Sequence, residues 1–223
     1  MKRKTWVACA VALGLGVSAS AANAVTFDFK DPNIDRPAND NDFFWDDVGG
    51  AGETAADINT TGLWIKASAG TGGDAELYLD NITNPNVGLG VDDDNGGSDE
   101  EVEDGESIIL EANMKVLLDS LEFWNPNHGS NFANGVFFDL YVTNGGIETL
   151  VLNNYQVANM IDLTAQNIMG TAFRFEADLA AGMAPDLGWY MGAAAMTPVP
   201  EPASLALLGM GLLGFGAARR RRT

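Results

Sequence analysis

Nine carboxylates lie within the fifteen residues from Asp92 to Glu106, and this acidic segment is the part of the sequence best equipped for chemistry. Calcium binds about six to eight hard oxygen ligands, which a flexible, glycine-containing acidic loop can supply. Asp92, Asp94 and Glu103 fall at positions 1, 3 and 12 of an EF-hand count, with a glycine at position 6. Position 5 is also glycine and the flanks have strand-like patterns, so a true EF-hand is not expected. Calcium at Asp92, Asp94 and Glu103 is therefore one hypothesis, and a solvated charged loop is the other.

The residue types of hydrolytic and metalloenzyme sites are scarce. The one histidine, His128, lies in the polar segment 125–131, and the one cysteine, Cys9, lies in the N-terminal leader. A zinc site would need one histidine plus carboxylates, and no Gly-x-Ser-x-Gly elbow supports a Ser-His-Asp triad. A glycosidase needs two carboxylates about 5 to 10 Å apart. Because the chain has 31 acidic residues, the sequence does not identify which two would form such a pair. We expect no catalytic site and no cofactor apart from calcium. A secreted enzyme acting on extracellular polysaccharide is the alternative.

Four aromatic residues offer a binding surface. If Leu63, Ile65 and Ala67 face the core, the alternation of a strand turns Trp64 outward, and the same parity applies to Tyr78, Phe137 and Tyr141. Exposed aromatic rings on a sheet stack on the apolar faces of sugars. The alternative is that the rings are partly covered by long loops, since aromatic residues are favoured in strands anyway.

The candidate residues lie in or between short stretches in which apolar and polar residues alternate. Gly, Asn, Asp and Pro separate these stretches. The pattern is typical of antiparallel strands. Asn144-Gly145-Gly146 predicts a hairpin turn, Asp162–Met169 a short helix, and Asn39–Asp42 a loop. We predict an all-β fold, an antiparallel, jelly-roll-like β-sandwich of about nine strands. The expected strands are Val25–Phe29, Leu63–Ser68, Glu76–Asn81, Ser107–Met114, Val116–Trp124, Gly135–Thr143, Ile147–Leu152, Thr171–Asp178 and Leu187–Met196.

The charge of the middle of the chain excludes one class of partner. The whole chain has a formal charge of −19, but between Val25 and Pro202 only five Lys and Arg stand against all 31 acids, a net charge of −26. Such a surface repels nucleic acid and anionic lipid, and it attracts divalent cations and basic partners. Because Cys9 is the sole cysteine, the exported part can form no internal disulfide.

The N-terminus has the features of a secretion signal. Met1–Lys4 is basic, Trp6–Val17 is apolar and expected to be helical, and Ala22-Asn23-Ala24 is a small-x-small site for signal peptidase. We expect cleavage after Ala24, with Ala22 and Ala24 as the two small residues of the site and Val25 as the first mature residue. A permanent N-terminal anchor is the alternative.

The C-terminus has three parts in order: Val199-Pro200-Glu201-Pro202, an apolar run from Ala203 to Ala218, and the basic cluster Arg219–Arg222. The apolar run would span about 24 Å as a helix, short of a hydrocarbon core of about 30 Å. Its glycines weaken the helix further. The arginines keep the end cytoplasmic. We therefore expect a hydrophobic helix that is held only transiently in the inner membrane.

These residues resemble the PEP-CTERM sorting signal, in which Pro200, Glu201 and Pro202 correspond to the Pro-Glu-Pro element. The resemblance implies an exosortase, a membrane protease that cleaves near this element, as partner. It also implies a Gram-negative bacterium that makes extracellular polysaccharide. A permanent single-pass anchor is the alternative. The stretch from Leu77 to Phe123 is similar to a recurrent pattern in exported PEP-CTERM domains, which implies a β-rich surface domain without an assigned activity.

The sequence thus predicts a signal peptide (1–24), an exported acidic domain (25–197) and a sorting signal (198–223). We expect a secreted or cell-surface protein that works without catalysis in the polysaccharide layer. Its role in this layer would be adhesion, structural support, or the binding of carbohydrate or cations.

Overall fold

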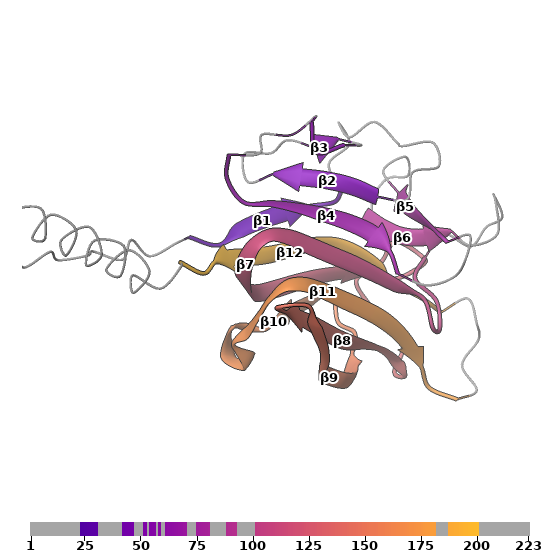
Figure 1. Ribbon diagram of the computed structural model, residues 1–223. Helices are drawn as coiled ribbons and strands as arrows, with labels where there is room; N and C mark the ends of the chain where they lie inside the picture. The colour runs from indigo at the N-terminus through magenta and orange to yellow at the C-terminus, as the bar shows by residue number, and fades with distance from the viewer. Residues whose placement is uncertain are drawn as a thin grey trace, which may run out of the picture. The chain divides into compact units, whose positions relative to one another are not determined.

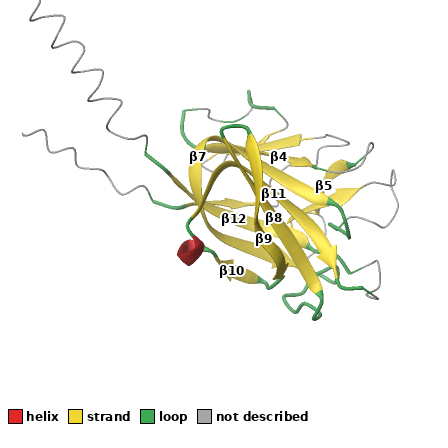
Figure 2. Cartoon of the chain, turned by 60° about the horizontal axis from the view of Figure 1, so that its bottom comes forward, coloured by secondary structure: helices red, strands yellow, loops and turns green. Residues whose placement is uncertain are grey.

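The computed structural model describes residues 23–30, 42–46, 51–52, 54–56, 58, 61–70, 75–80, 88–92, 101–181 and 187–200. Residues 22–199 form one compact unit. Figure 1 shows its strands, and Figure 2 shows that the described part has strands nearly throughout. The strands are β1 (Val25–Asp28), β2 (Asp42–Asp46), β3 (Ala51–Gly52), β4 (Trp64–Ala69), β5 (Glu76–Asp80), β6 (Gly88–Asp92), β7 (Ser107–Trp124), β8 (Val136–Asn144), β9 (Ile147–Gln156), β10 (Met160–Asp162), β11 (Ile168–Leu179) and β12 (Tyr190–Pro198), and the one short 3₁₀ helix is η1 (Thr164–Gln166).

The long strand β7 connects two groups of strands. Its first part pairs with β4 and β11, and its last part pairs with β12, β10 and the first residues of β11. Between the two parts, the ladder with β11 jumps from the pair Ala172–Glu111 to the pair Gly170–Val116. Residues 112–115 of β7 therefore project from that ladder as a bulge, and a bulge bends the strand that carries it.

The antiparallel pairings form one branched network. Its main path runs β3-β2-β4-β7-β11-β8-β9, and β12 joins β7 to β1 and to the β5–β6 pair. The two groups share one hydrophobic core. The rings of Phe123 (β7) and Phe138 (β8) are 5.4 Å apart, and those of Phe29 and Trp45 are 4.8 Å apart. Each fully buried aromatic side chain contributes about 1.5 to 3 kcal/mol, so these contacts stabilise the union of the two groups.

The all-β, antiparallel prediction is confirmed, but its strand count was too low. The predicted strands Ser107–Met114 and Val116–Trp124 are one strand, β7, because the exposed bulge residues do not interrupt it. Strands β2, β3, β6 and β10 were not predicted, and Asp42, assigned to a loop, begins β2. The jelly-roll sandwich is not confirmed, since the pairings form one network. The signal helix and the C-terminal helix fall on residues outside those described.

The predicted hairpin turn between β8 and β9 is confirmed. Asn144 pairs with Ile147, and the φ angles of Gly145 and Gly146 are 59° and 81°. Two positive φ angles are those of a type I′ turn, which favours glycine. The predicted helix Asp162–Met169 was wrong beyond one turn, because Asn167 adopts a left-handed conformation (φ 51°) that ends η1.

Alternation along β8 and β11 is confirmed as well. Phe173 and Phe175 are fully buried, as are Phe138 and Leu140.

No helix among the described residues is long and apolar enough to cross a membrane.

Candidate functional site

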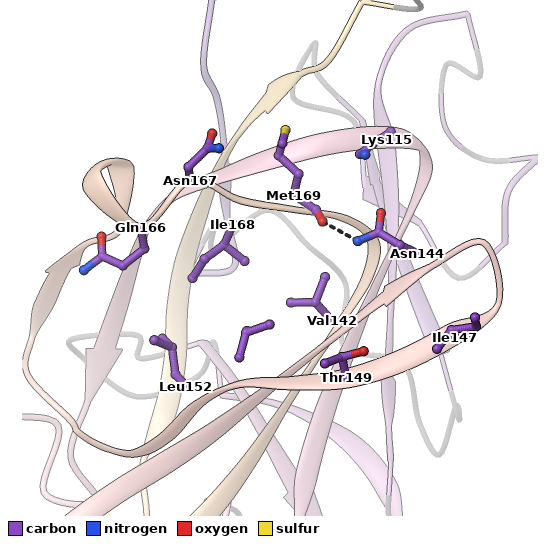
Figure 3. A pocket seen from close by; sticks show the side chains of 11 residues that line it. Lys115, Val142, Asn144, Ile147, Thr149, Leu152, Gln166, Asn167, Ile168 and Met169 are labelled. Carbon is purple, nitrogen blue, oxygen red and sulfur yellow. Dashed lines mark hydrogen bonds between the residues drawn. The ribbon is translucent and has the colours of Figure 1, made fainter.

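An open groove of about 750 Å³ lies beside the β8–β9 hairpin (Figure 3). It is bounded by the hairpin, by η1 with the start of β11, and by the bulge of β7. Its lining comprises Lys115, Val142, Asn144, Ile147, Thr149, Val151, Leu152, Gln166, Asn167, Ile168 and Met169. The groove is therefore built from segments far apart in the sequence.

Two side-chain hydrogen bonds join the hairpin to the start of β11. Asn144 donates from Nδ2 to the carbonyl oxygen of Met169 (2.7 Å), as Figure 3 shows, and Thr171 Oγ1 donates to the carbonyl of Thr143 (3.2 Å). Asn167, in its left-handed conformation, turns the chain from η1 into β11. The hairpin and η1 are thus held on opposite sides of the groove.

The groove offers apolar surface with amide groups around it. Val142 and Ile168 are buried at its base, whereas Ile147 is 72% exposed and Val151 42% exposed. Lys115 is the one ionisable side chain in the lining. Concave, mostly apolar surfaces with a few polar groups are the usual form of ligand sites.

A charged cluster covers the outward face of β8, β9 and β11. Arg174 makes a two-pronged ion pair with Glu148, from Nε to Oε1 (3.1 Å) and from Nη2 to Oε2 (3.0 Å), and also pairs with Glu176. The hydrogen bonds from Arg174 lower the pKa of Glu148 and raise that of Arg174. The guanidinium of Arg174 also lies over the ring of Tyr141.

Four acidic side chains lie close together farther along β11. Burial raises the pKa of Asp178, and the charges of Asp139, Asp104 and Glu176 raise it further. Two of these carboxylates accept backbone hydrogen bonds, Asp104 from the amide of Leu179 (3.0 Å) and Asp139 from an amide of β9 (2.7 Å). Burial and these neighbouring carboxylates thus disfavour the charged form of Asp178.

The four predicted aromatic residues lie opposite buried neighbours, as expected, and each is partly exposed. Trp64, Phe137 and Tyr141 share the outward face of the main path, but Tyr78 lies on β5, in the branch beyond β12. Trp64 contacts Phe44, with ring centroids 5.8 Å apart, and Arg174 covers Tyr141. The structure does not bring the four rings into one platform, and sugar binding by them stays a prediction.

The predicted calcium ligands are only partly visible. Asp92 ends β6, Glu103 lies shortly before β7, and Asp94 lies outside the described residues. The backbone amide of Glu103 donates to the Glu106 carboxylate (2.7 Å). In the part of the chain that the structure describes, no three His, Cys, Asp or Glu side chains are grouped as metal ligands would be. Calcium binding at Asp92, Asp94 and Glu103 stays a prediction.

His128 lies in a loop organised by Asn125. Asn125 Oδ1 accepts hydrogen bonds from the amides of Asn127 (3.0 Å) and Gly129 (2.8 Å). The His128 amide donates to the Asn125 carbonyl (2.8 Å), and its ring meets the ring of Tyr190 edge-on. These contacts give His128 a structural place in the loop.

Of the predicted processing residues, Ala24 and Pro200 are described and both are exposed, whereas Ala22, Glu201 and Pro202 lie outside the described residues. Ala24 directly precedes β1, whose first residue, Val25, pairs with Met196 of β12. The amide of Val199 donates to the carbonyl of Lys115 (2.9 Å). Both ends of the exported domain therefore leave it beside the bulge of β7.

Sequence reasoning missed the groove. One signal was present: the 22 residues from Leu140 to Ile161 contain a single charged side chain, Glu148, in a chain whose residues 25–202 carry a net charge of −26.

Comparison with known protein families gives one match, at the C-terminal end of the chain. No curated protein and no solved structure matches the chain. Residues 198–222 match the family model of the PEP-CTERM protein-sorting motif. The resemblance seen in the sequence is confirmed, and the chain carries the sorting motif that is characteristic of exosortase substrates.

Proposed function

We propose that this chain is a surface or extracellular-matrix protein with a non-enzymatic, structural or adhesive role in the polysaccharide layer of a Gram-negative cell. The observation that carries this proposal is the sorting motif at residues 198–222, which begins at the last residue of β12. A motif placed directly after the fold delivers the whole acidic β domain to the cell surface. Signal peptidase would remove residues 1–24, and an exosortase would act at the Pro-Glu-Pro element.

The route includes a transient stage in the inner membrane. The run from Ala203 to Ala218 is apolar apart from Ser204, and Arg219–Arg222 follows it. Such a run enters a bilayer, and the basic cluster keeps its end on the cytoplasmic side. Its short length and its glycines suit release better than permanent anchorage.

The chemistry of the described surface supports binding over catalysis. The groove presents aliphatic and amide side chains with one lysine, and the charged cluster around Arg174 is internally paired. We further infer that the two strand groups joined by β7 act together as a sandwich-like module, a rigid support for such surfaces.

The test uses the full chain expressed in a host that has an exosortase and makes the polysaccharide. We expect the processed protein to co-purify with the extracellular polysaccharide and to release no reducing sugar from it. Release of reducing sugar would establish the alternative, a secreted enzyme. Retention of all the protein in the periplasm would contradict the proposed location.

A further inference from the structure

We propose that one end of the domain lies against the lipid bilayer while the tail is held in the membrane. This membrane-facing end comprises the bulge of β7 (residues 112–115), the β8–β9 turn (residues 144–147) and the groove between them. The inference rests on the membrane stage of the proposed function and names the surface that this stage uses.

The first argument is the position of the chain ends. The amide of Val199 is bonded to the carbonyl of Lys115, which lies in the bulge and lines the groove. The strands β1 and β12 pair through Val25 and Met196, so the start of the mature chain lies there too (Figure 1). Both segments expected to meet the membrane leave the domain at this end.

The second argument is the length of the tether. The apolar run begins at Ala203, four residues after Val199. Fully extended, this stretch spans at most about 14 Å. A tail inserted in the bilayer therefore holds this end of the domain at the membrane surface, within the depth of the lipid headgroups and the water beside them.

The third argument is the chemistry of the end itself. Met114 in the bulge is 37% exposed and Ile147 at the turn is 72% exposed, next to the apolar groove. Exposed aliphatic side chains enter the boundary between headgroups and acyl chains. Lys115 follows Met114, lines the groove with Ile147, and can extend its ammonium group toward lipid phosphates.

The fourth argument is the distribution of charge. The stretch from Leu140 to Ile161 has Glu148 as its one charged residue, and Arg174 neutralises it. The acidic segment 101–106 lies away from the membrane-facing end, since it contacts the start of β12 and the end of β11. An anionic lipid surface repels that segment and favours the orientation in which the end that carries Lys115 faces the bilayer.

A second copy of the chain is the competing occupant of this surface. Among the described residues β9 pairs with β8 alone, so one edge is open to another strand. However, two register shifts interrupt the β8–β9 ladder, and such irregularities twist an edge away from regular pairing. The high negative charge of each copy also opposes self-association.

The test uses the full chain, with its tail, reconstituted in vesicles of phosphatidylethanolamine and phosphatidylglycerol. Because Cys9 is the sole cysteine, Cys9→Ser leaves a background for single labels. Met114→Cys and Ile147→Cys carry an environment-sensitive fluorophore. Ser130→Cys carries the same fluorophore as the control, because Ser130 is exposed in the loop that follows the last residue of β7. We expect a blue shift and at least about twofold quenching by spin-labelled lipid at positions 114 and 147, with none at 130.

The outcomes separate the two proposals. Chains that float with the vesicles but show no quenching at 114 and 147 overturn this inference and leave the membrane stage intact. Chains that do not float overturn both. Equal quenching at 130 would show that the domain lies on lipid without the proposed orientation. A shift at 147 that follows protein concentration without lipid would identify a second copy as the occupant. Either result overturns the inference.

Discussion

The guanidinium carbon of Arg174 lies 3.7 Å from the centroid of the Tyr141 ring, while the same group pairs with Glu148 and Glu176. Arg174 on β11 and Tyr141 on β8 are cross-strand partners, so the stack joins neighbouring strands on the outward face. Cross-strand pairs are the local units of sheet stability. The ring that was predicted to meet a sugar is thus covered by a side chain of the protein.

Replacing Arg174 should cost stability through the loss of both the stack and the ion pairs. We expect Arg174→Met to lower the free energy of unfolding by about 1 to 2 kcal/mol. Arg174→Lys should recover part of this loss, since an ammonium cannot reproduce the two-pronged geometry. Urea unfolding followed by circular dichroism measures both.

Lys66→Met is the matched control, because Lys66 pairs with Glu111 (2.8 Å) on the same face but is more exposed. Its cost should be about 0.5 kcal/mol or less. Equal losses for Arg174→Met and Lys66→Met would show that the stack on Tyr141 contributes nothing.

The acidic cluster at Asp178 should make stability depend on pH. A carboxyl group whose pKa is raised by folding destabilises the folded state at neutral pH, and the penalty disappears as pH falls through the raised pKa. We expect Asp178→Asn to raise the free energy of unfolding at pH 7 by up to about 1 kcal/mol. The gain should shrink in high salt and vanish in acid.

Glu148 should behave in the opposite way. Its pKa is lowered by Arg174, so its contribution is present at neutral pH and is lost as pH falls through the lowered pKa. Glu148→Gln should therefore lower the free energy of unfolding at pH 7 by about a few tenths of a kcal/mol. The effect is small because solvent screens the exposed ion pair. Urea unfolding at several pH values measures both variants. A loss of stability at pH 7 in Asp178→Asn would contradict the assignment of repulsion to this cluster.

Two glycines with positive φ should respond differently to alanine. A Cβ at Gly88 (φ 111°) would lie 2.2 Å from the carbonyl oxygen of Met191, whereas a Cβ at Gly146 (φ 81°) meets nothing within 4 Å. Gly146→Ala should cost about 1 to 2 kcal/mol from backbone strain alone. Gly88→Ala adds a backbone clash and should cost more than about 3 kcal/mol. Thermal unfolding tests this, and similar losses would reject the close approach of β6 to β12.

The sequence was most informative where local rules decide the structure. The alternation that buries Phe173 and Phe175, and the glycines that require positive φ after Asn144, can be read from neighbouring residues. Strand β2 was missed because the Asn- and Asp-rich stretch before it indicates a loop, although Phe43, Phe44 and Trp45 favour a strand. The place of β2 depends on its pairing with β4, which is distant in the sequence.

The candidate site was less predictable than the fold. The groove depends on Asn144 reaching Met169 and on the bulge that places Lys115 beside Val199, and both contacts join residues far apart in the sequence. What the sequence showed was the lack of charge from Leu140 to Ile161. The sorting motif, in contrast, is a linear signal and was recognised directly from its residues.

The central claim is that the motif at residues 198–222 directs this acidic β domain to the surface through an exosortase. Its most direct test is the mass and location of the chain in which Pro200, Glu201 and Pro202 are replaced by alanine, in a host with an exosortase. Pro198→Ala, outside the Pro-Glu-Pro element, serves as the control. We expect the control to be shortened and found at the surface, and the triple variant to remain longer and membrane-bound. An unchanged mass and location of the triple variant would contradict the account.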